Sequence, residues 1–330
     1  MSTKLKATIL ILIATAIWGF SFPINRYAMG YVDPMAFCGL RFLFGALALI
    51  PIAMRRAGRG PGPGASYLQE HPRLWLWAGV VTGLVLALAT SLQYYGLSIT
   101  TSAKSGFITG LYVTMVPLFG FVMGQLPPRS VWIGLAVGLV GLILISGTDT
   151  SGGFNRGDAL TMVADLFWAA HVLLMGYFAL KVNPWQYVAV QAVVSAVFCL
   201  VIAFIFNSLP DIETFVKILP CALYGILSVS VAYVCQFKGQ KDVSCAEAAL
   251  LMQLQSVIAG IAGVIFLGEV MTKFMWVGAF LMVAGSLIAQ RTAQTKMILK
   301  GSPHFNEFLL ARFVVAATLV SLCSLAVIVT

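Results

Sequence analysis

Apolar residues fall into eleven long runs that short polar segments separate. Each run has about the 20 residues that an α-helix needs to cross the hydrocarbon core of a bilayer. This pattern predicts an all-α integral membrane protein. The predicted spans cover residues 7–29, 33–54, 74–98, 102–124, 129–147, 157–180, 184–206, 216–238, 243–267, 273–290 and 308–329.

The first ten runs form two halves that carry similar residues at corresponding positions. Trp18 corresponds to Trp168, and the pair Asp33-Pro34 corresponds to Asn183-Pro184. Each half has five spans, so the second half must enter the membrane from the opposite side, as in the inverted repeats of transporters. The sequence therefore predicts a ten-helix inverted-repeat (5+5) bundle plus one extra C-terminal transmembrane helix. The expected divisions are residues 1–147, 148–290 and 291–330.

The basic residues indicate the orientation in the membrane. Fourteen of the 20 Lys and Arg residues lie on the side of the N-terminus, five lie on the other side, and Arg41 lies inside a span. Because cytoplasmic loops carry the excess of basic residues, we expect a cytoplasmic N-terminus. After eleven spans the C-terminus would lie outside. Ala14-Thr15-Ala16 resembles a signal-peptidase site, but the apolar run continues through Trp18 and Phe22, so we expect the first helix to be retained.

The composition agrees with a membrane protein. The chain is 60% hydrophobic and 9% charged, whereas a soluble domain carries roughly 25% charged residues. The net charge of +9 follows from the basic loop residues and does not indicate nucleic acid binding. None of the six cysteines forms a Cys-x-x-Cys pair, and the sequence has no ATP-binding, zinc-protease or serine-hydrolase motif. We therefore expect no cofactor, no metal and no catalytic residue.

Several motifs in the first ten spans resemble those of one transporter family. They are Ala-Ile-Trp-Gly-Phe-Ser-Phe at 16–22, Asp33-Pro34 followed by Arg41, Phe-Ile-Thr-Gly-Leu-Tyr-Val at 107–113, and Leu-Gly-Glu at 267–269. Over about residues 7–290 the chain resembles the EamA-type transporters of the drug/metabolite transporter superfamily. The resemblance implies a ten-helix inverted repeat with a central cavity, and often export of amino acids, other metabolites or drugs. The chain departs from the pattern near Ser256, where the family has proline.

Ionisable residues inside spans cost about 2.5–3.5 kcal/mol each to insert, so each needs a partner or a function. Arg41 and Asp165 are predicted at the same depth, and we hypothesise that they form an ion pair. The pair would be a gate or an anchor for a zwitterionic or anionic solute, or else a permanent structural contact.

Three further ionisable residues each allow two interpretations. Lys104 either attracts anionic groups or extends its ammonium to the lipid head-groups. Glu247 is, with Asp165, a candidate for proton coupling, or it forms a capping box with Ser244. His171 either passes protons or is a core histidine.

Aromatic and amide side chains complete the candidate site, because such groups avoid lipid and face the bundle interior. Gln253 and Gln255 cannot share one helix face, so only one of them is expected to face the cavity. The candidate substrate-binding or gating residues are Trp18, Arg41, Tyr94, Lys104, Tyr112, Asp165, Trp168, His171, Gln236 and Gln253.

Glycines mark the expected helix contacts. Gly134, Gly138 and Gly141 lie in the fifth span, and Gly278 and Gly285 repeat their spacing in the tenth. Small residues let helices approach closely. We expect these two spans to pack together; a contact between two copies of the chain is the alternative.

The sequence as a whole predicts a secondary transporter of the cytoplasmic (inner) membrane. It would export small metabolites such as amino acids or drug-like solutes by alternating access between its halves. The expected partners are the lipid bilayer, a small solute and, as a candidate coupling ion, the proton; a homodimer is an open alternative. A non-transporting membrane partner or regulatory subunit is the rival interpretation. A membrane-embedded enzyme would need a converging group of acids or histidines, which the scattered charges do not provide.

Overall fold

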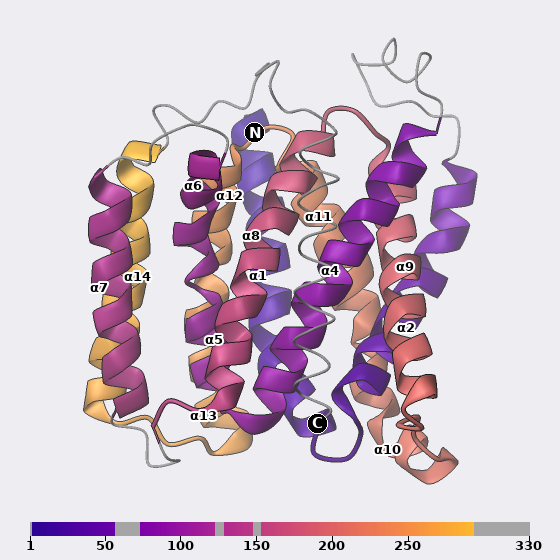
Figure 1. Cartoon of the computed structure of the whole chain (residues 1–330). Coiled ribbons are helices and arrows are strands. Elements are labelled where there is room, and N and C mark those ends of the chain that lie inside the picture. The colour runs from indigo at the N-terminus through magenta and orange to yellow at the C-terminus, as the bar shows by residue number, and fades with distance from the viewer. Residues whose placement is uncertain (1, 57–72, 123–128, 148–152, 294–330) are drawn as a thin grey trace.

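The computed structural model describes residues 2–56, 73–122, 129–147 and 153–293. Every regular element in these ranges is a helix, and most of the helices run nearly parallel along one axis (Figure 1). The elements are α1 (Thr3–Ala28), α2 (Pro34–Arg55), α4 (Leu74–Ile99), α5 (Ser102–Thr109), α6 (Tyr112–Val122), α7 (Arg129–Gly147), α8 (Arg156–Phe178), α9 (Pro184–Ile205), α10 (Ile212–Leu223), the π-helical turn η1 (Ile226–Val231), α11 (Ala232–Gly239), α12 (Cys245–Met252), α13 (Leu254–Leu267) and α14 (Lys273–Ala293).

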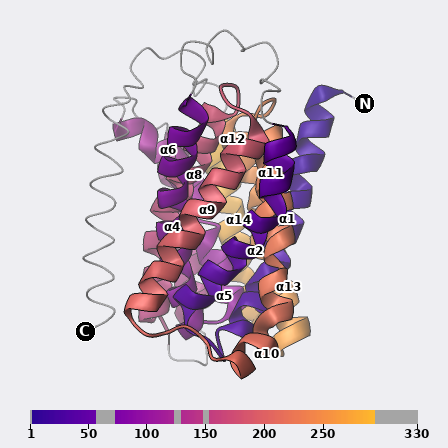
Figure 2. The ribbon, with the colours of Figure 1, turned by 90° about the vertical axis from the view of Figure 1, so that its right-hand side faces the viewer.

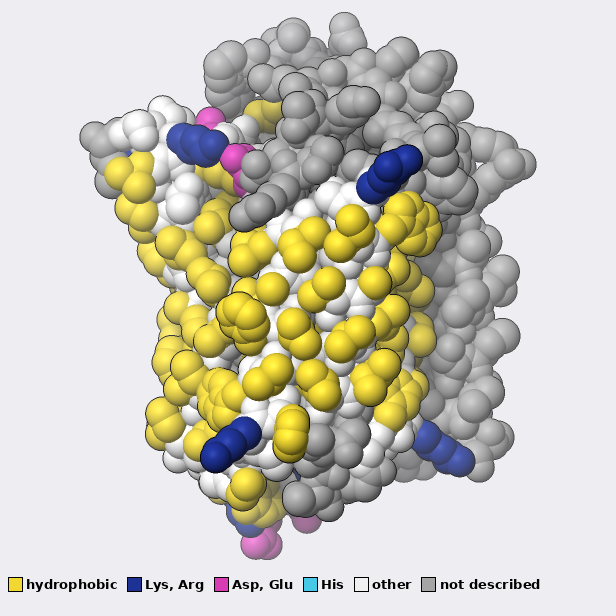
Figure 3. All heavy atoms as spheres, turned by 90° about the vertical axis from the view of Figure 1, so that its left-hand side faces the viewer, with side chains coloured by type: hydrophobic (Ala, Val, Ile, Leu, Met, Phe, Trp, Pro, Cys, Tyr) yellow, Lys and Arg dark blue, Asp and Glu magenta, His cyan; other side chains and the backbone are white. Residues whose placement is uncertain are grey.

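The helices have the length and surface of membrane spans. Seven helical segments of the described chain are long and apolar enough to cross a bilayer, and two shorter apolar segments lie in α7 and α14. On the face that Figure 3 shows, apolar side chains cover the middle and basic side chains lie towards the ends. Ile143 and Phe280 are among the exposed apolar residues, at 68% and 71% exposure. Such a surface fits a lipid environment.

Three predicted spans are less regular than expected, and one cannot be compared. The span 102–124 is divided into α5 and α6 at Gly110 and Leu111, and the span 243–267 is divided into α12 and α13. The span 216–238 contains η1, whose wider turn shifts the backbone hydrogen-bond ladder. Residues 308–329 lie outside the described part of the chain.

Matching caps start the second helix of each half. The Asp33 carboxylate accepts hydrogen bonds from the amides of Met35 (2.8 Å) and Ala36. The Asn183 side chain accepts one from the amide of Trp185 at 3.0 Å. In both helices a proline follows the cap at the first helical position, where its missing N–H costs nothing. These two helices, α2 and α9, pack against each other, and α9 also packs against α4 (Figure 2).

The glycine-mediated contact between α7 and α14 is confirmed. A Cβ atom at Gly278 would lie 2.5 Å from the backbone oxygen of Gly141, and one at Gly285 would lie 2.5 Å from that of Gly134. The two backbones are therefore too close for any larger side chain, and the helices lie side by side in Figure 1. Because these glycine surfaces contact each other within one chain, the pattern gives no separate support for a homodimer.

Candidate functional site

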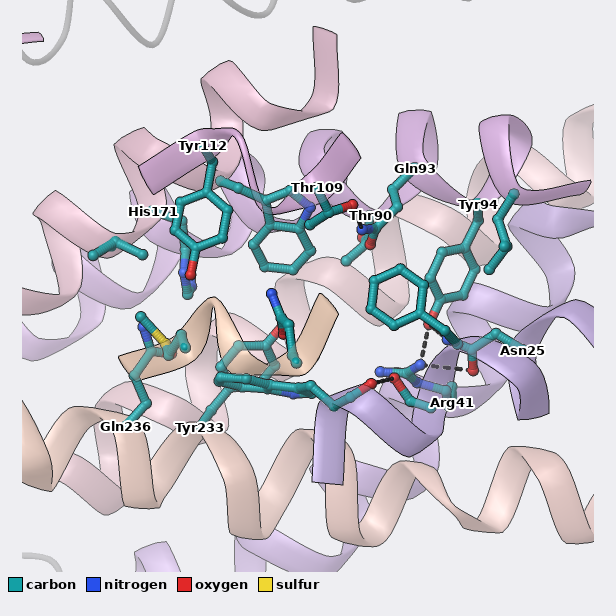
Figure 4. Close-up of a pocket in the computed structure, with 18 residues that line it drawn as sticks. Asn25, Arg41, Thr90, Gln93, Tyr94, Thr109, Tyr112, His171, Tyr233 and Gln236 are labelled. Carbon is teal, nitrogen blue, oxygen red and sulfur yellow. Dashed lines mark hydrogen bonds between the residues drawn. The ribbon is translucent and has the colours of Figure 1, made fainter. Parts of the chain in front are cut away.

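An internal cavity lies at the centre of the bundle, with walls from both halves of the chain (Figure 4). Its volume is about 50 Å³, room for only a few water molecules. A solute could enter only if the surrounding side chains moved apart. Seven predicted site residues line it: Trp18, Arg41, Tyr94, Tyr112, Trp168, His171 and Gln236. Further lining residues that were not predicted as site residues include Asn25, Thr90, Gln93, Thr109 and Tyr233.

Arg41 lies at one end of the cavity, and Tyr112, His171 and Gln236 lie at the other (Figure 4). The Arg41 side chain is buried, and its Nη1 donates hydrogen bonds to Asn25 Oδ1 at 2.9 Å and to the Tyr94 hydroxyl. Asn25 Nδ2 donates to the same hydroxyl at 2.9 Å. These contacts tie together α1, α2 and α4, and they fix the direction of the guanidinium.

The hypothesis of an Arg41–Asp165 ion pair is wrong. Arg41 bonds to Asn25 and Tyr94, and neither oxygen of the fully buried Asp165 carboxylate has a hydrogen-bond partner among the described residues. The similar predicted depth did not bring the two together, because α2 and α8 pack mainly on other helices and not on each other. Helix α2 packs mainly on α9, η1 and α4, whereas α8 packs mainly on α4, α6 and α5.

Asp165 nevertheless lies close to the cavity. It is one helical turn from Trp168 on α8, and residues at that spacing share a helix face. Its carboxyl group also lies within electrostatic range of Tyr112, which lines the cavity. The carboxyl group is thus buried beside the cavity with no donor from the described chain.

Lys104 has a partner that the sequence analysis missed. Its Nζ lies 2.8 Å from Asp158 Oδ2 and donates to the Gly153 carbonyl oxygen at 2.6 Å. Asp158 also accepts from Thr100 and forms a capping box with Asn155 at the start of α8. Lys104 therefore holds the beginning of α8 and does not line the cavity. The spacing Asn155-x-x-Asp158 was the available signal for the capping box.

Glu247 and Gln253 also lie away from the cavity. Glu247 forms a capping box with Ser244 and an ion pair with Lys4 at 2.8 Å, so the capping interpretation is confirmed. Gln253 donates to Ser286 Oγ at 2.7 Å and thereby connects to α14. Of the two glutamines that cannot share a face, Gln255 is the one that lines the cavity.

Aromatic rings form the middle of the cavity wall. The ring centroids of Trp18 and Tyr233 are 5.0 Å apart, and His171 lies 5.5 Å from Tyr233 and 5.9 Å from Trp168. Trp18 Nε1 donates to the carbonyl oxygen of Ser228 in η1 at 2.9 Å, which satisfies a group in the shifted ladder of that turn. Trp18 thereby joins the first half of the chain to the irregular span of the second.

Besides Arg41 Nε, two polar atoms in the wall lack a hydrogen-bond partner among the described residues. Trp168 Nε1 and Gln236 Oε1 are buried and have no hydrogen-bond partner among the described residues. His171 differs, because its Nε2 lies 3.4 Å from Gln191 Oε1. Within the described ranges, no group of three His, Cys, Asp or Glu residues is placed to hold a metal ion. The arrangement can therefore hold a small molecule by hydrogen bonds, aromatic contacts and one positive charge.

Comparisons with known proteins give a consistent result. The model of the EamA-like transporter family matches residues 5–147 and residues 155–290. The chain is 26% identical to an uncharacterized transporter of Archaeoglobus fulgidus, over 86% of each chain. It is 26% identical to the uncharacterized transporter YoaV of Bacillus subtilis, over 85% of this chain and 95% of YoaV.

Two further similarities concern location and fold. The chain is 24% identical to the uncharacterized inner membrane transporter YedA of Escherichia coli strain K12, over 79% of this chain and 82% of YedA. A solved structure, described only as the crystal structure of a protein, matches with a TM-score of 0.63 at 20% identity. That match covers 88% of this chain and 98% of the other, and it shows a shared fold.

Proposed function

This chain belongs to the EamA-like transporter family, and we propose that it is a secondary transporter that exports small solutes such as amino acids or drug-like compounds. The protein is a multi-pass membrane transporter with a relative in the inner membrane of Escherichia coli. The observation that carries the proposal is the internal cavity, whose wall combines side chains from both halves of the chain. Transporters place their solute site at such an interface between repeats.

The mechanism we propose is alternating access between two inverted halves, residues 1–147 and 148–290. Corresponding residues support it: Trp18 and Trp168 both line the cavity, and Asp33 and Asn183 cap corresponding helices. The small cavity volume corresponds to a closed form in this mechanism. Rocking of one half against the other would open the cavity to each side in turn. The excess of basic residues on the side of the N-terminus supports a cytoplasmic N-terminus.

We further propose that Asp165 carries a proton during the cycle. A buried charged carboxylate without hydrogen-bond donors is costly, and taking up a proton removes the charge. If the solute and the side of access changed the surroundings of this group, proton uptake and release would be coupled to solute movement. Glu247 fits this role less well, because its carboxylate already accepts hydrogen bonds from Lys4 and from the amide of Ser244.

Measurements of solute flux into proteoliposomes test both the proposed transport and the proposed proton role of Asp165. Purified protein is assayed with a panel of amino acids and cationic drugs, with and without a pH gradient. We expect saturable flux of at least one compound and a faster rate with the gradient. Asp165→Asn should keep flux without the gradient and lose the acceleration. Glu247→Gln should keep the acceleration and serves as the matched control.

The possible results separate the two claims. A full response to the gradient in Asp165→Asn would remove the proton role and leave the transport proposal standing. Absence of saturable flux for the whole panel, with protein that is monodisperse and folded, would count against transport of these solute classes.

A further inference from the structure

Arg41 is a buried cation whose hydrogen-bond partners among the described residues are neutral. Its side chain is 4% exposed, and Nη1 bonds to an amide oxygen of Asn25 and the phenol of Tyr94. Two acidic residues of the described chain are fully buried. Asp158 is bound by Lys104, and Asp165 has no hydrogen-bond donor among the described residues. No described carboxylate therefore balances the charge of Arg41.

The guanidinium also has a free edge. Arg41 Nε is buried and has no hydrogen-bond partner among the described residues, although the side chain lines the cavity. Asn25 and Tyr94 hold Nη1 and so fix the plane of the group (Figure 4). An arginine commonly binds a carboxylate through two parallel N–H donors of its planar fork. A buried positive charge with a free donor needs an anion, and the cavity is the space that Arg41 faces.

We propose that the transported solute is an organic carboxylate whose negative group binds Arg41. This inference rests on the proposed transport function and narrows its solute class. The aromatic wall of Trp18 and Tyr233 would contact an apolar or aromatic body of the solute. Gln236 Oε1, at the end of the cavity opposite Arg41 (Figure 4), and Trp168 Nε1 are unpartnered and would bond to a second polar group of the solute. Cationic drugs would be rejected, since Arg41 would repel them in a site shielded from water.

Pairs of acids and their primary amides test the proposal, because each pair differs chiefly in charge. Hydrocinnamate, phenylalanine and leucine are compared with their amides, and tetraphenylphosphonium represents the cationic drugs. Each compound is added as a competitor, and the measurement is how strongly it reduces the saturable solute flux into proteoliposomes without a pH gradient. We expect at least one acid to compete at least about 30-fold more strongly than its amide, the loss typical when a buried charge pair forfeits one member. Tetraphenylphosphonium should not compete.

Variants at Arg41 distinguish a role of this residue in solute binding from a role in the stability of the fold. Arg41→Gln should reduce the preference for acid over amide by about 30-fold. Arg41→Lys should restore part of it, because lysine keeps the charge and loses the planar fork. Arg26→Gln is the matched control: Arg26 Nη1 donates to the Ser98 carbonyl oxygen at 2.8 Å and does not line the cavity. The preference of Arg26→Gln for acid over amide should equal that of the wild type.

The results distinguish failure of the inference from failure of the proposed function. Equal competition by acids and amides in the wild type would overturn the carboxylate assignment while transport remained shown, as would competition by tetraphenylphosphonium alone. An unchanged preference in Arg41→Gln, with a lower melting temperature, would make Arg41 a purely structural residue. If Arg41→Gln does not fold, Arg41→Lys and the wild-type acid and amide pairs still decide. Absence of all saturable flux would count against the proposed function itself.

Discussion

Asp158 and Asp165 lie on the same helix, are both fully buried, and are in opposite situations. They are two turns apart on α8, and neither side chain is exposed. Asp158 is bound by Lys104, Thr100 and the Asn155 amide, whereas Asp165 has no hydrogen-bond partner among the described residues. The contrast teaches that burial of a carboxylate does not by itself reveal its role. Its partners do: Asp158 is positioned to hold the fold, whereas the lack of partners at Asp165 is the basis of the proton role proposed for it.

Removing the charge of Asp158 should have the largest effect on stability. Asp158→Asn leaves the Lys104 ammonium buried without its carboxylate, and breaking a buried pair in this way costs about 3–5 kcal/mol. We expect a clear fall in the melting temperature of the detergent-purified protein, measured by thermal unfolding. Lys104→Gln in the same chain should recover part of the loss, since the uncompensated charge is then gone. If Asp158→Asn had the melting temperature of the wild type, the conclusion that Asp158 holds the fold through its partners would be wrong.

Asp165→Asn should change stability little. The exchange replaces one buried polar group without partners by another of the same shape, so the unfolding free energy should change by no more than about 1 kcal/mol. The same thermal unfolding measurement checks it beside Asp158→Asn. A loss as large as that of Asp158→Asn would mean that Asp165 holds the fold through groups outside the described residues, and the proposed proton role would lose its basis.

The sequence predicted well those features that depend on local or periodic patterns. The capping box of Ser244 and Glu247 follows from residue type and spacing, and the packing of α7 on α14 follows from glycine spacing. Seven cavity residues were found because polar and aromatic groups in a span must face inward. Patterns of this kind carry their physical reason within one helix.

The sequence failed where the outcome depended on which helices become neighbours. The predicted depth placed Arg41 and Asp165 together, but α2 and α8 do not pack mainly on each other, and the two side chains are unpaired. Lys104 and Asp158 pair across two halves of the chain, a contact that no local spacing reveals. The division at Gly110 and the π-helical turn η1 could not be predicted by counting apolar residues, because the sequence stays apolar through both irregularities.

A double-mutant cycle between Arg41 and Asp165 sharpens the correction. Residues that share no contact have nearly additive effects, so the interaction energy between Arg41→Gln and Asp165→Asn should be below about 0.5 kcal/mol. Unfolding of the two single variants and the double variant gives this value. Lys104→Gln and Asp158→Asn supply the positive control, because their groups are in contact and should couple strongly. An interaction energy of similar size for Arg41 and Asp165 would mean that the two side chains do interact, as the ion-pair hypothesis states.

The smallest effect is expected at a third aspartate, Asp211, which is exposed and caps α10. Its carboxylate accepts a hydrogen bond from the Thr214 amide at 2.8 Å, and this bond holds the pKa of Asp211 below its ordinary value. A lowered pKa in the folded state means that the charged form stabilises the protein above the unfolded pKa. That contribution is lost as the pH falls through the folded pKa.

Asp211→Ala should therefore lower the melting temperature slightly at neutral pH, and the difference from the wild type should shrink as the medium becomes acidic. Asp211→Asn should behave almost like the wild type, because asparagine is an equally good cap. Water surrounds the Asp211 side chain and can replace the lost bond, whereas it cannot reach Asp158. A loss in Asp211→Ala as large as in Asp158→Asn would show that capping of a helix start contributes as much to stability as pairing of a buried charge. The difference between Asp158 and Asp165 would then reflect their positions along α8 and not their partners.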